Sequence, residues 1–240
     1  MLKVNPEELV REGWITLGTI GMQGGISASD LEGLSRNLRQ PSNHGIDESV
    51  AGYKFVVLEN RQGGGSYPPS VTSYSIIATQ EKTPVVVVMA PKDITTLVMR
   101  NYLSTQLHGK EFDLREVHFQ DFSDKLKEAE ARAISGAADF TYEGFTLSKM
   151  GNGFLRHRTY ARERDWTGEE GFRQILTLEP EVKDWHVAAV YMKLGGIAIN
   201  LFDTGHAALW LPGNIEGPKL KAITDAATKM HNVFSAYSVN

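Results

Sequence analysis

Four arginines and three aromatic residues lie close together in residues 154–166 of a chain that is mildly acidic overall. The chain has 240 residues, with 25 lysines and arginines, 29 aspartates and glutamates, and a formal net charge of -4. In an extended strand, every second side chain points to the same side. One side of this segment therefore carries the following residues: Phe154, Arg156, Arg158, Tyr160, Arg162, Arg164 and Trp166.

This combination of residue types predicts nucleic-acid binding. A guanidinium group can hold a phosphate through two parallel hydrogen bonds. An aromatic ring can stack on a base, which contributes about 1–3 kcal/mol per base. We therefore expect a protein that binds single-stranded nucleic acid or RNA, in which the four arginines hold phosphates while Phe154, Tyr160 and Trp166 stack on bases. This function requires no catalytic residue, metal or cofactor.

Two other interpretations of the same strand stay open. Glu163 and Asp165 alternate with the arginines, and Glu169 and Glu170 follow, so acids on a neighbouring segment can neutralise the arginines. The strand can equally belong to a subunit contact, because free strand edges and aromatic side chains are typical of interfaces. The alternative function is therefore a structural subunit of a homo-oligomer or of a larger assembly.

A third function, that of a hydrolase, depends on aspartates. Residues 199–212 (INLFDTGHAALWLP) resemble the catalytic Asp-Thr-Gly segment of the pepsin family over about 14 of the 240 residues. The resemblance implies that Asp203 is one of two carboxylates that share a proton to activate water. The chain has no second Asp-Thr-Gly or Asp-Ser-Gly, so a homodimer would have to supply the partner acid. The same residues, Asp203-Thr204-Gly205, also suit a hairpin turn in which the glycine takes a positive φ.

Other titratable residues give weaker signals. Lys92, Asp93 and Asp121 follow two expected strands, 85–89 and 114–119, and parallel strands would bring their carboxyl ends to one edge of a sheet. Such a cluster can hold a metal or a phosphate, although both aspartates also suit helix N-caps. No His-x-x-x-His or Gly-x-Ser-x-Gly motif indicates a zinc site or a serine hydrolase. Five of the seven histidines are scattered through the middle and C-terminal parts of the sequence: His108, His118, His157, His186 and His206.

Composition limits the class of protein. Hydrophobic residues make up 41% of the chain and there are no cysteines, which excludes disulfide scaffolds, thiolate zinc sites and iron–sulfur clusters. The longest apolar run, Val85 to Ala90, is far shorter than the roughly 20 residues of a membrane span. The chain begins without an apolar signal segment, so we expect a soluble, cytoplasmic protein with no membrane partner.

The elements that must position these residues follow from local patterns. Residues rich in β-branched and aromatic side chains, separated by turn signals, predict a series of strands. They are expected at 14–20, 53–59, 71–79, 85–89, 114–119, 140–149, 154–164, 172–179, 187–194, 197–202 and 207–211. Helices are expected at about 31–39, 94–107 and 123–134, and from Pro218 onward. The last helix carries an apolar stripe of Leu220, Ile223, Ala227, Met230 and Phe234.

These elements predict an α+β fold. A mixed β/α N-terminal layer extends to about residue 135, and an antiparallel β-meander packed against a C-terminal helix follows. No linker is long enough to separate two independent domains, so residues 1–240 are expected to form a single domain. Two lobes, 1–135 and 136–240, are the alternative.

Overall fold

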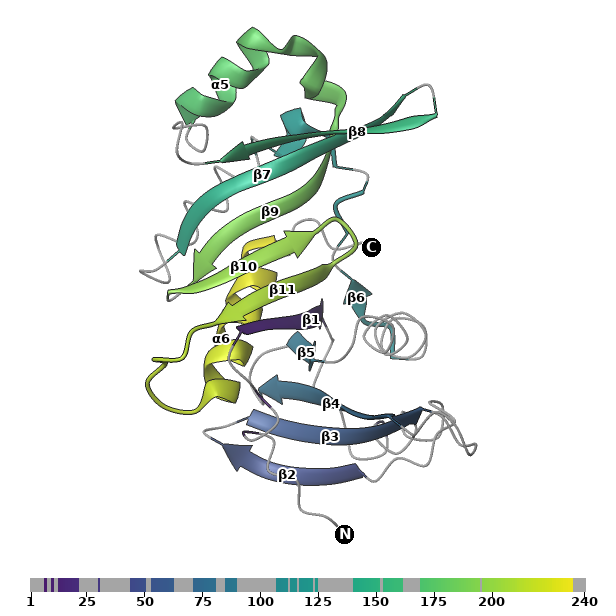
Figure 1. Cartoon of the computed structure of the whole chain (residues 1–240), viewed down its shortest axis with the longest axis vertical. Coiled ribbons are helices and arrows are strands. Elements are labelled where there is room, and N and C mark those ends of the chain that lie inside the picture. The colour runs from purple at the N-terminus through teal and green to yellow at the C-terminus, as the bar shows by residue number, and fades with distance from the viewer. Residues whose placement is uncertain are drawn as a thin grey trace.

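Antiparallel strands dominate the part of the chain that the structure describes. The computed structural model describes residues 7, 10, 13–21, 30, 44–50, 53–62, 71–80, 85–89, 107–111, 113–115, 117–122, 124, 140–151, 153–161, 169–194 and 196–234. Within these residues eleven strands form one sheet (Figure 1). The strands are β1 (Gly13–Gly21), β2 (His44–Val50), β3 (Tyr53–Gln62), β4 (Val71–Gln80), β5 (Val85–Met89), β6 (Lys110–Glu111), β7 (Phe140–Gly151), β8 (Phe154–Ala161), β9 (His186–Leu194), β10 (Ile197–Phe202) and β11 (His206–Leu211). The helices are α5 (Glu169–Leu178), the 3-10 helix η3 (Pro180–Asp184) and α6 (Lys219–Phe234).

The sheet consists of an N-terminal half and a C-terminal half. The order across it is β2-β3-β4-β5-β1-β11-β10-β9-β7-β8, and β6 pairs with the end of β1. β1 and β11 meet along Gly13–Gly18 and His206–Leu211, so strands from the two ends of the chain join the halves. In Figure 1 the strands run from β2 at the bottom to β8 at the top, which places β8 at one edge of the sheet.

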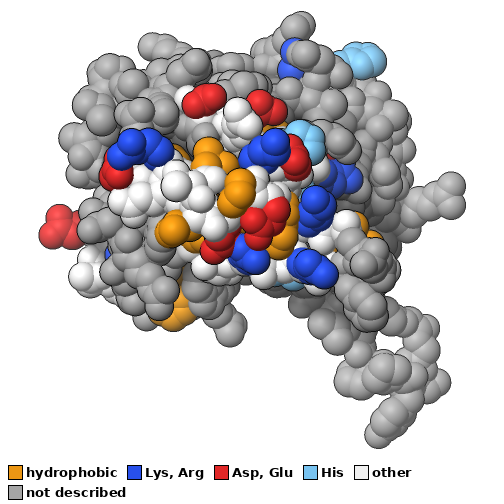
Figure 2. Space-filling model, turned by 90° about the horizontal axis from the view of Figure 1, so that it is seen from above, with side chains coloured by type: hydrophobic (Ala, Val, Ile, Leu, Met, Phe, Trp, Pro, Cys, Tyr) orange, Lys and Arg blue, Asp and Glu red, His pale blue; other side chains and the backbone are white. Residues whose placement is uncertain are grey.

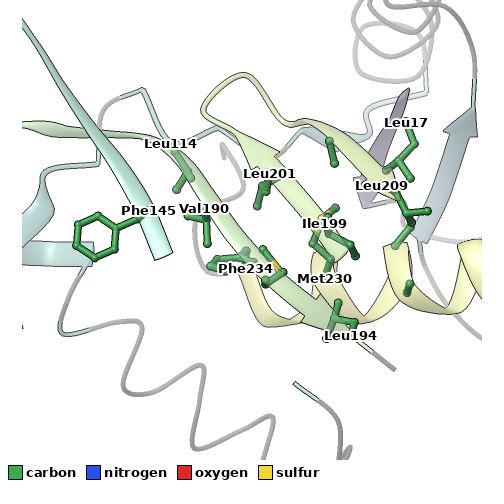
Figure 3. Packing of buried hydrophobic residues seen from close by; sticks show 14 of the residues in the cluster. Leu17, Leu114, Phe145, Val190, Leu194, Ile199, Leu201, Leu209, Met230 and Phe234 are labelled. Carbon is green, nitrogen blue, oxygen red and sulfur yellow. The ribbon is translucent and has the colours of Figure 1, made fainter. Parts of the chain in front are cut away.

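α6 covers the middle of one sheet face. It contacts β1, β5, β9 and β11, and the apolar stripe predicted for it is confirmed, because all five stripe residues are buried. In Figure 3, Phe234 of this helix lies beside Val190 of β9, and Met230 lies near Ile199 of β10. Burying one side chain of this size contributes about 1.5–3 kcal/mol, so the helix and the sheet stabilise each other.

A group of buried aromatic rings holds α5 over β7 and β8. The ring centroids of Phe119 and Phe145 are 5.1 Å apart, those of Phe145 and Tyr160 are 5.1 Å apart, and those of Phe119 and Phe172 are 5.7 Å apart. These spacings are typical of favourable aromatic pairs. The aromatic group therefore determines which face of β8 is covered by α5 and η3.

The strand expected at 172–179 is wrong, because most of this segment belongs to α5. Phe172 and Ile175 are buried three positions apart, while the exposed Arg173 pairs with Glu170 at 2.7 Å. Spacings of three and four are those of a helix. A short apolar run is compatible with either period, and here the packing of Phe172 against Phe145 favours the helix.

The strand expected at 114–119 is also wrong. Within the described residues this segment makes one isolated bridge, from His118 to His186, and a helical turn begins at Phe119. The backbone N–H of Phe119 donates to the carbonyl of Trp185 at 2.7 Å, which anchors the segment at the start of β9. All described strand pairings are antiparallel, so the described residues contain no parallel pair between 85–89 and 114–119.

The coarser prediction of an antiparallel sheet with a C-terminal helix is confirmed. β2 was not predicted, since four of its seven residues are polar or charged. The helices expected at 31–39, 94–107 and 123–134 lie almost entirely outside the described residues. Among the helices that are described, none has the length and apolar character needed to cross a membrane.

Candidate nucleic-acid interface

β8 is an edge strand whose register is set by β7. Arg156 lies opposite Lys149, and Tyr160 lies opposite Phe145. The expected strand is confirmed for Phe154–Ala161, and alternation places three residues of the predicted site on one face: Arg156, Arg158 and Tyr160. The remaining four predicted residues are not described in full. The side chain of Phe154 lies outside the described part of the chain, and so do three whole residues, Arg162, Arg164 and Trp166.

The guanidinium group of Arg158 is engaged by acids of the protein itself. It pairs with the carboxylate of Glu179 and, at 3.3 Å, with that of Glu181. Its Cζ atom also lies 5.2 Å from the ring centroid of Trp185. These partners all come from the segment between α5 and β9. Arg158 therefore fits the alternative interpretation, in which acids of the protein neutralise the arginines. Its contacts connect β8 to η3.

Tyr160 is buried and has no free ring face. It is 8% exposed, its ring stacks on Phe145, and its hydroxyl donates to a carboxylate oxygen of Glu179 at 3.1 Å. Burial raises the pKa of Tyr160, and the nearby charge of Arg158 opposes this shift. In this conformation no base can stack on Tyr160, contrary to the sequence prediction.

Lys149 and Arg156 lie at the projecting end of the β7–β8 hairpin. β9 begins at His186, opposite Ser148, so residues 149–156, called here the hairpin tip, extend beyond the third strand. Both side chains are exposed, and neither forms an ion pair within the described part of the chain. Like charges directly opposite each other destabilise a strand pair. An anion bound beside them would relieve this repulsion.

The turn of the hairpin explains why these two cations meet. Gly151 lies opposite Phe154, so two residues connect the strands, and Gly153 has a φ of 78°. Two-residue hairpin loops need a positive φ, which glycine adopts without strain. Lys149 was not among the predicted site residues, although the Gly-Asn-Gly sequence two residues later identifies it as the cross-strand neighbour of Arg156.

Charges of both signs surround the hairpin tip. The pKa of Glu181 is lowered, first by a hydrogen bond from its own backbone N–H and also by Arg158 and Lys149. Figure 2 views this end of the molecule and shows Lys and Arg side chains beside Asp and Glu side chains, around exposed hydrophobic groups. Arg158 faces two carboxylates, so the charges of Lys149, Arg156, Arg158, Glu179 and Glu181 sum to +1. Lys149 and Arg156 are the two of these cations that form no ion pair with a described acid.

On the opposite face of the sheet, Ser148, His186 and Asp203 come together. The Oγ atom of Ser148 lies 2.6 Å from Nε2 of His186, and Oδ2 of Asp203 lies 3.9 Å from the same nitrogen. In a serine-hydrolase triad the carboxylate binds the other ring nitrogen. Ser148 is also only 2% exposed. The cluster therefore connects β7, β9 and the β10–β11 turn without the geometry of a triad.

Asp203 occupies the turn between β10 and β11. Gly205 has a φ of 78°, so the interpretation of Asp203-Thr204-Gly205 as a hairpin turn is confirmed. Burial raises the pKa of Asp203, and the neighbouring His186 and Arg115 oppose this shift. The carbonyl of Asp203 accepts a hydrogen bond from the backbone N–H of Leu114 at 2.8 Å. These contacts assign Asp203 a structural role at this turn.

The other predicted acidic site is not assembled in the described residues. Asp121 is exposed in the helical turn that begins at Phe119, and Lys92 and Asp93 lie outside the described residues. The histidines are less scattered than the sequence indicates, because His118 lies opposite His186 in the row that contains Ser148. Within the described part of the chain, no group of three His, Asp or Glu side chains is placed to hold a metal.

No protein-family model matches the chain, and no curated protein matches its sequence. The function therefore has to be inferred from the geometry and charge of the hairpin.

Proposed function

We propose that the protein binds nucleic acid through the basic face of the β7–β8 hairpin. The observation that carries the proposal is the pair of exposed cations, Lys149 and Arg156, directly opposite each other at a projecting end. Phosphate groups would remove their mutual repulsion, and both side-chain types bind phosphate. Arg162 and Arg164 continue the same sequence pattern beyond the described strand.

Arg158 and Tyr160 support the hairpin in this proposal. Both are bound to Glu179, and the ring of Tyr160 is part of the aromatic group under α5. These contacts hold the base of the hairpin against α5 and η3, so that the tip projects in one orientation. This supporting role replaces the phosphate contact and the base stacking expected from the sequence.

Fluorescence anisotropy with labelled oligonucleotides tests the proposal. The variant Lys149→Gln/Arg156→Gln removes two charges from the hairpin tip. We expect weaker binding and a slope of log affinity against log salt that is shallower by about 1.4, because each phosphate contact to a single strand contributes about 0.7. Unchanged affinity in this variant would contradict the proposal.

A matched control removes the same charge elsewhere. Arg173→Gln/Lys221→Gln also lowers the net charge by two, and each of these side chains pairs with an acid on its own helix. This control should bind like the wild type. If it weakens binding as much as the tip variant does, the effect comes from net charge and not from the hairpin.

The structural-subunit alternative is distinguished by light scattering with and without oligonucleotide. A stable oligomer that is indifferent to nucleic acid would favour that alternative. Charged side chains on an edge strand oppose edge-to-edge pairing between copies. Arg156 and Arg158 therefore make β8 a poor edge for self-association through its backbone.

A further inference from the structure

The hairpin tip has an apolar face as well as a basic one. Met150 and Leu155 lie directly opposite each other and are 66% and 52% exposed. Because side chains alternate along a strand, these two point away from the face that carries Lys149 and Arg156. The projecting ribbon thus offers one face to phosphates and the other to apolar groups.

The dimensions of the tip match one groove of DNA. β7 continues three residues beyond Ser148, to Gly151, which is about 10 Å at 3.4 Å per residue. The major groove of B-DNA is about 12 Å wide and 8.5 Å deep and admits a two-stranded ribbon, whereas the minor groove is only about 6 Å wide. The major groove of double-stranded RNA is too deep and narrow for side chains to read.

The arrangement of the two faces also fits this groove. If Met150 and Leu155 face the base edges, they meet the C5-methyl groups of thymines, which are the apolar groups on the floor of the major groove. Lys149 and Arg156 then lie at the level of the phosphates, one on each strand of the ribbon. Both cations are on the outer face of the ribbon, away from the bases, so their long side chains bend sideways to reach phosphates on the two rims of the groove.

Among its described residues, the basic face has no aromatic ring that is open for stacking. Proteins that bind single strands without sequence preference stack successive bases on aromatic rings. On the described part of this face the aromatic residue is Tyr160, and its ring is buried against Phe145. Within the described residues, the tip therefore offers cations and apolar side chains but no open aromatic ring.

We propose that the hairpin tip enters the major groove of duplex DNA, with Met150 and Leu155 against thymine methyl groups and with Lys149 and Arg156 on phosphates of the two backbones. This inference rests on the proposed function. It narrows the ligand from nucleic acid in general to duplex DNA that contains thymine.

The test compares three labelled ligands of one A·T-rich sequence with the full chain: a DNA duplex, the same duplex with deoxyuridine in place of thymidine, and the single strand. The two duplexes differ in the methyl group alone. We expect the thymidine duplex to bind more tightly than the single strand. We also expect it to bind about fourfold more tightly than the deoxyuridine duplex for each methyl group that is buried.

Each other outcome has a distinct meaning. Equal affinity for the two duplexes, or tighter binding of the single strand, would overturn this inference and leave the proposed function standing. Tight binding of an RNA duplex of the same sequence would overturn it in the same way. Failure to bind any of the ligands would reject both the inference and the proposed function.

Variants then assign the methyl contact to the tip. Met150→Ser/Leu155→Ser should abolish the difference between the thymidine and deoxyuridine duplexes. The control Leu178→Ser changes another exposed leucine, at the end of α5, and should keep the difference. A tip variant that still distinguishes the two duplexes would overturn the assignment of Met150 and Leu155, and the comparison of duplexes with wild-type protein stands even if a variant fails to fold.

Discussion

His231 should make the stability of the protein depend on pH. The residue is 5% exposed in α6, and its Nδ1 lies 3.2 Å from the hydroxyl oxygen of Thr19 in β1. A Cβ atom at Gly21 would lie 3.1 Å from Nε2 of the ring, so the imidazole is packed closely against the strand. Burial lowers the pKa of His231 from 6.5 to about 4, because the charged form would lose its hydration there.

The direction and size of the effect follow from proton linkage. The unfolded chain binds a proton at this residue near pH 6.5, whereas the folded chain binds it only near pH 4. The stability due to the neutral ring is therefore complete above pH 6.5 and is lost as the pH falls from 6.5 to 4. At about 1.4 kcal/mol per pKa unit, this one group should lower the free energy of unfolding by about 2 kcal/mol between pH 8 and pH 5.

Urea unfolding at pH 8 and at pH 5 measures this difference. His231→Gln removes the titration and keeps a group that can hydrogen-bond to Thr19, so the difference between the two pH values should shrink by about 2 kcal/mol relative to the wild type. Met230→Leu alters the adjacent core packing without changing a titratable group and should keep the wild-type difference. An equally large difference in His231→Gln would refute the conclusion that the buried ring stays neutral in the folded protein.

Two further substitutions test the support of the hairpin. Arg158→Leu removes the contacts to Glu179, Glu181 and Trp185, and should lower the free energy of unfolding by about 1 kcal/mol in urea at low salt, with a smaller loss at high salt; no loss would mean that these contacts do not hold the hairpin. Phe172→Ala removes the ring that connects α5 to the aromatic group and should lower the free energy of unfolding by about 3–5 kcal/mol in the same assay. The control Phe172→Leu should lower it less. A decrease below 1 kcal/mol for the alanine variant would contradict the packing of α5.

Local patterns were sufficient to predict β9, β10, β11 and α6. The glycines at 195, 196 and 205 separate short runs of alternating burial, and the apolar residues of α6 recur at three- and four-residue spacing. These patterns depend only on residues that are close together in the sequence. They can therefore be recognised without the rest of the structure.

The segments at 114–119 and 172–179 could not be assigned correctly in this way. Each contains a short apolar run that is compatible with a strand or a helix. The choice depends on partners far away in the chain, namely Trp185 for the backbone of Phe119 and Phe145 for the ring of Phe172. In α6 the distant contact adds to a helix that local signals already predict: Glu7 accepts a hydrogen bond from the N–H of Leu220 at 3.1 Å, at the first turn.

For the candidate site, the sequence by itself determined that Arg156 and Arg158 share a face, because side chains on an extended chain must alternate. Only the tertiary structure decided that Arg158 is neutralised by Glu179 and Glu181 while Arg156 meets Lys149 at a projecting end. The physical reason is that charge pairing depends on distance in space. Such distances are set only once β7 and β8 have taken their register and the aromatic rings have fixed α5 and η3 above them.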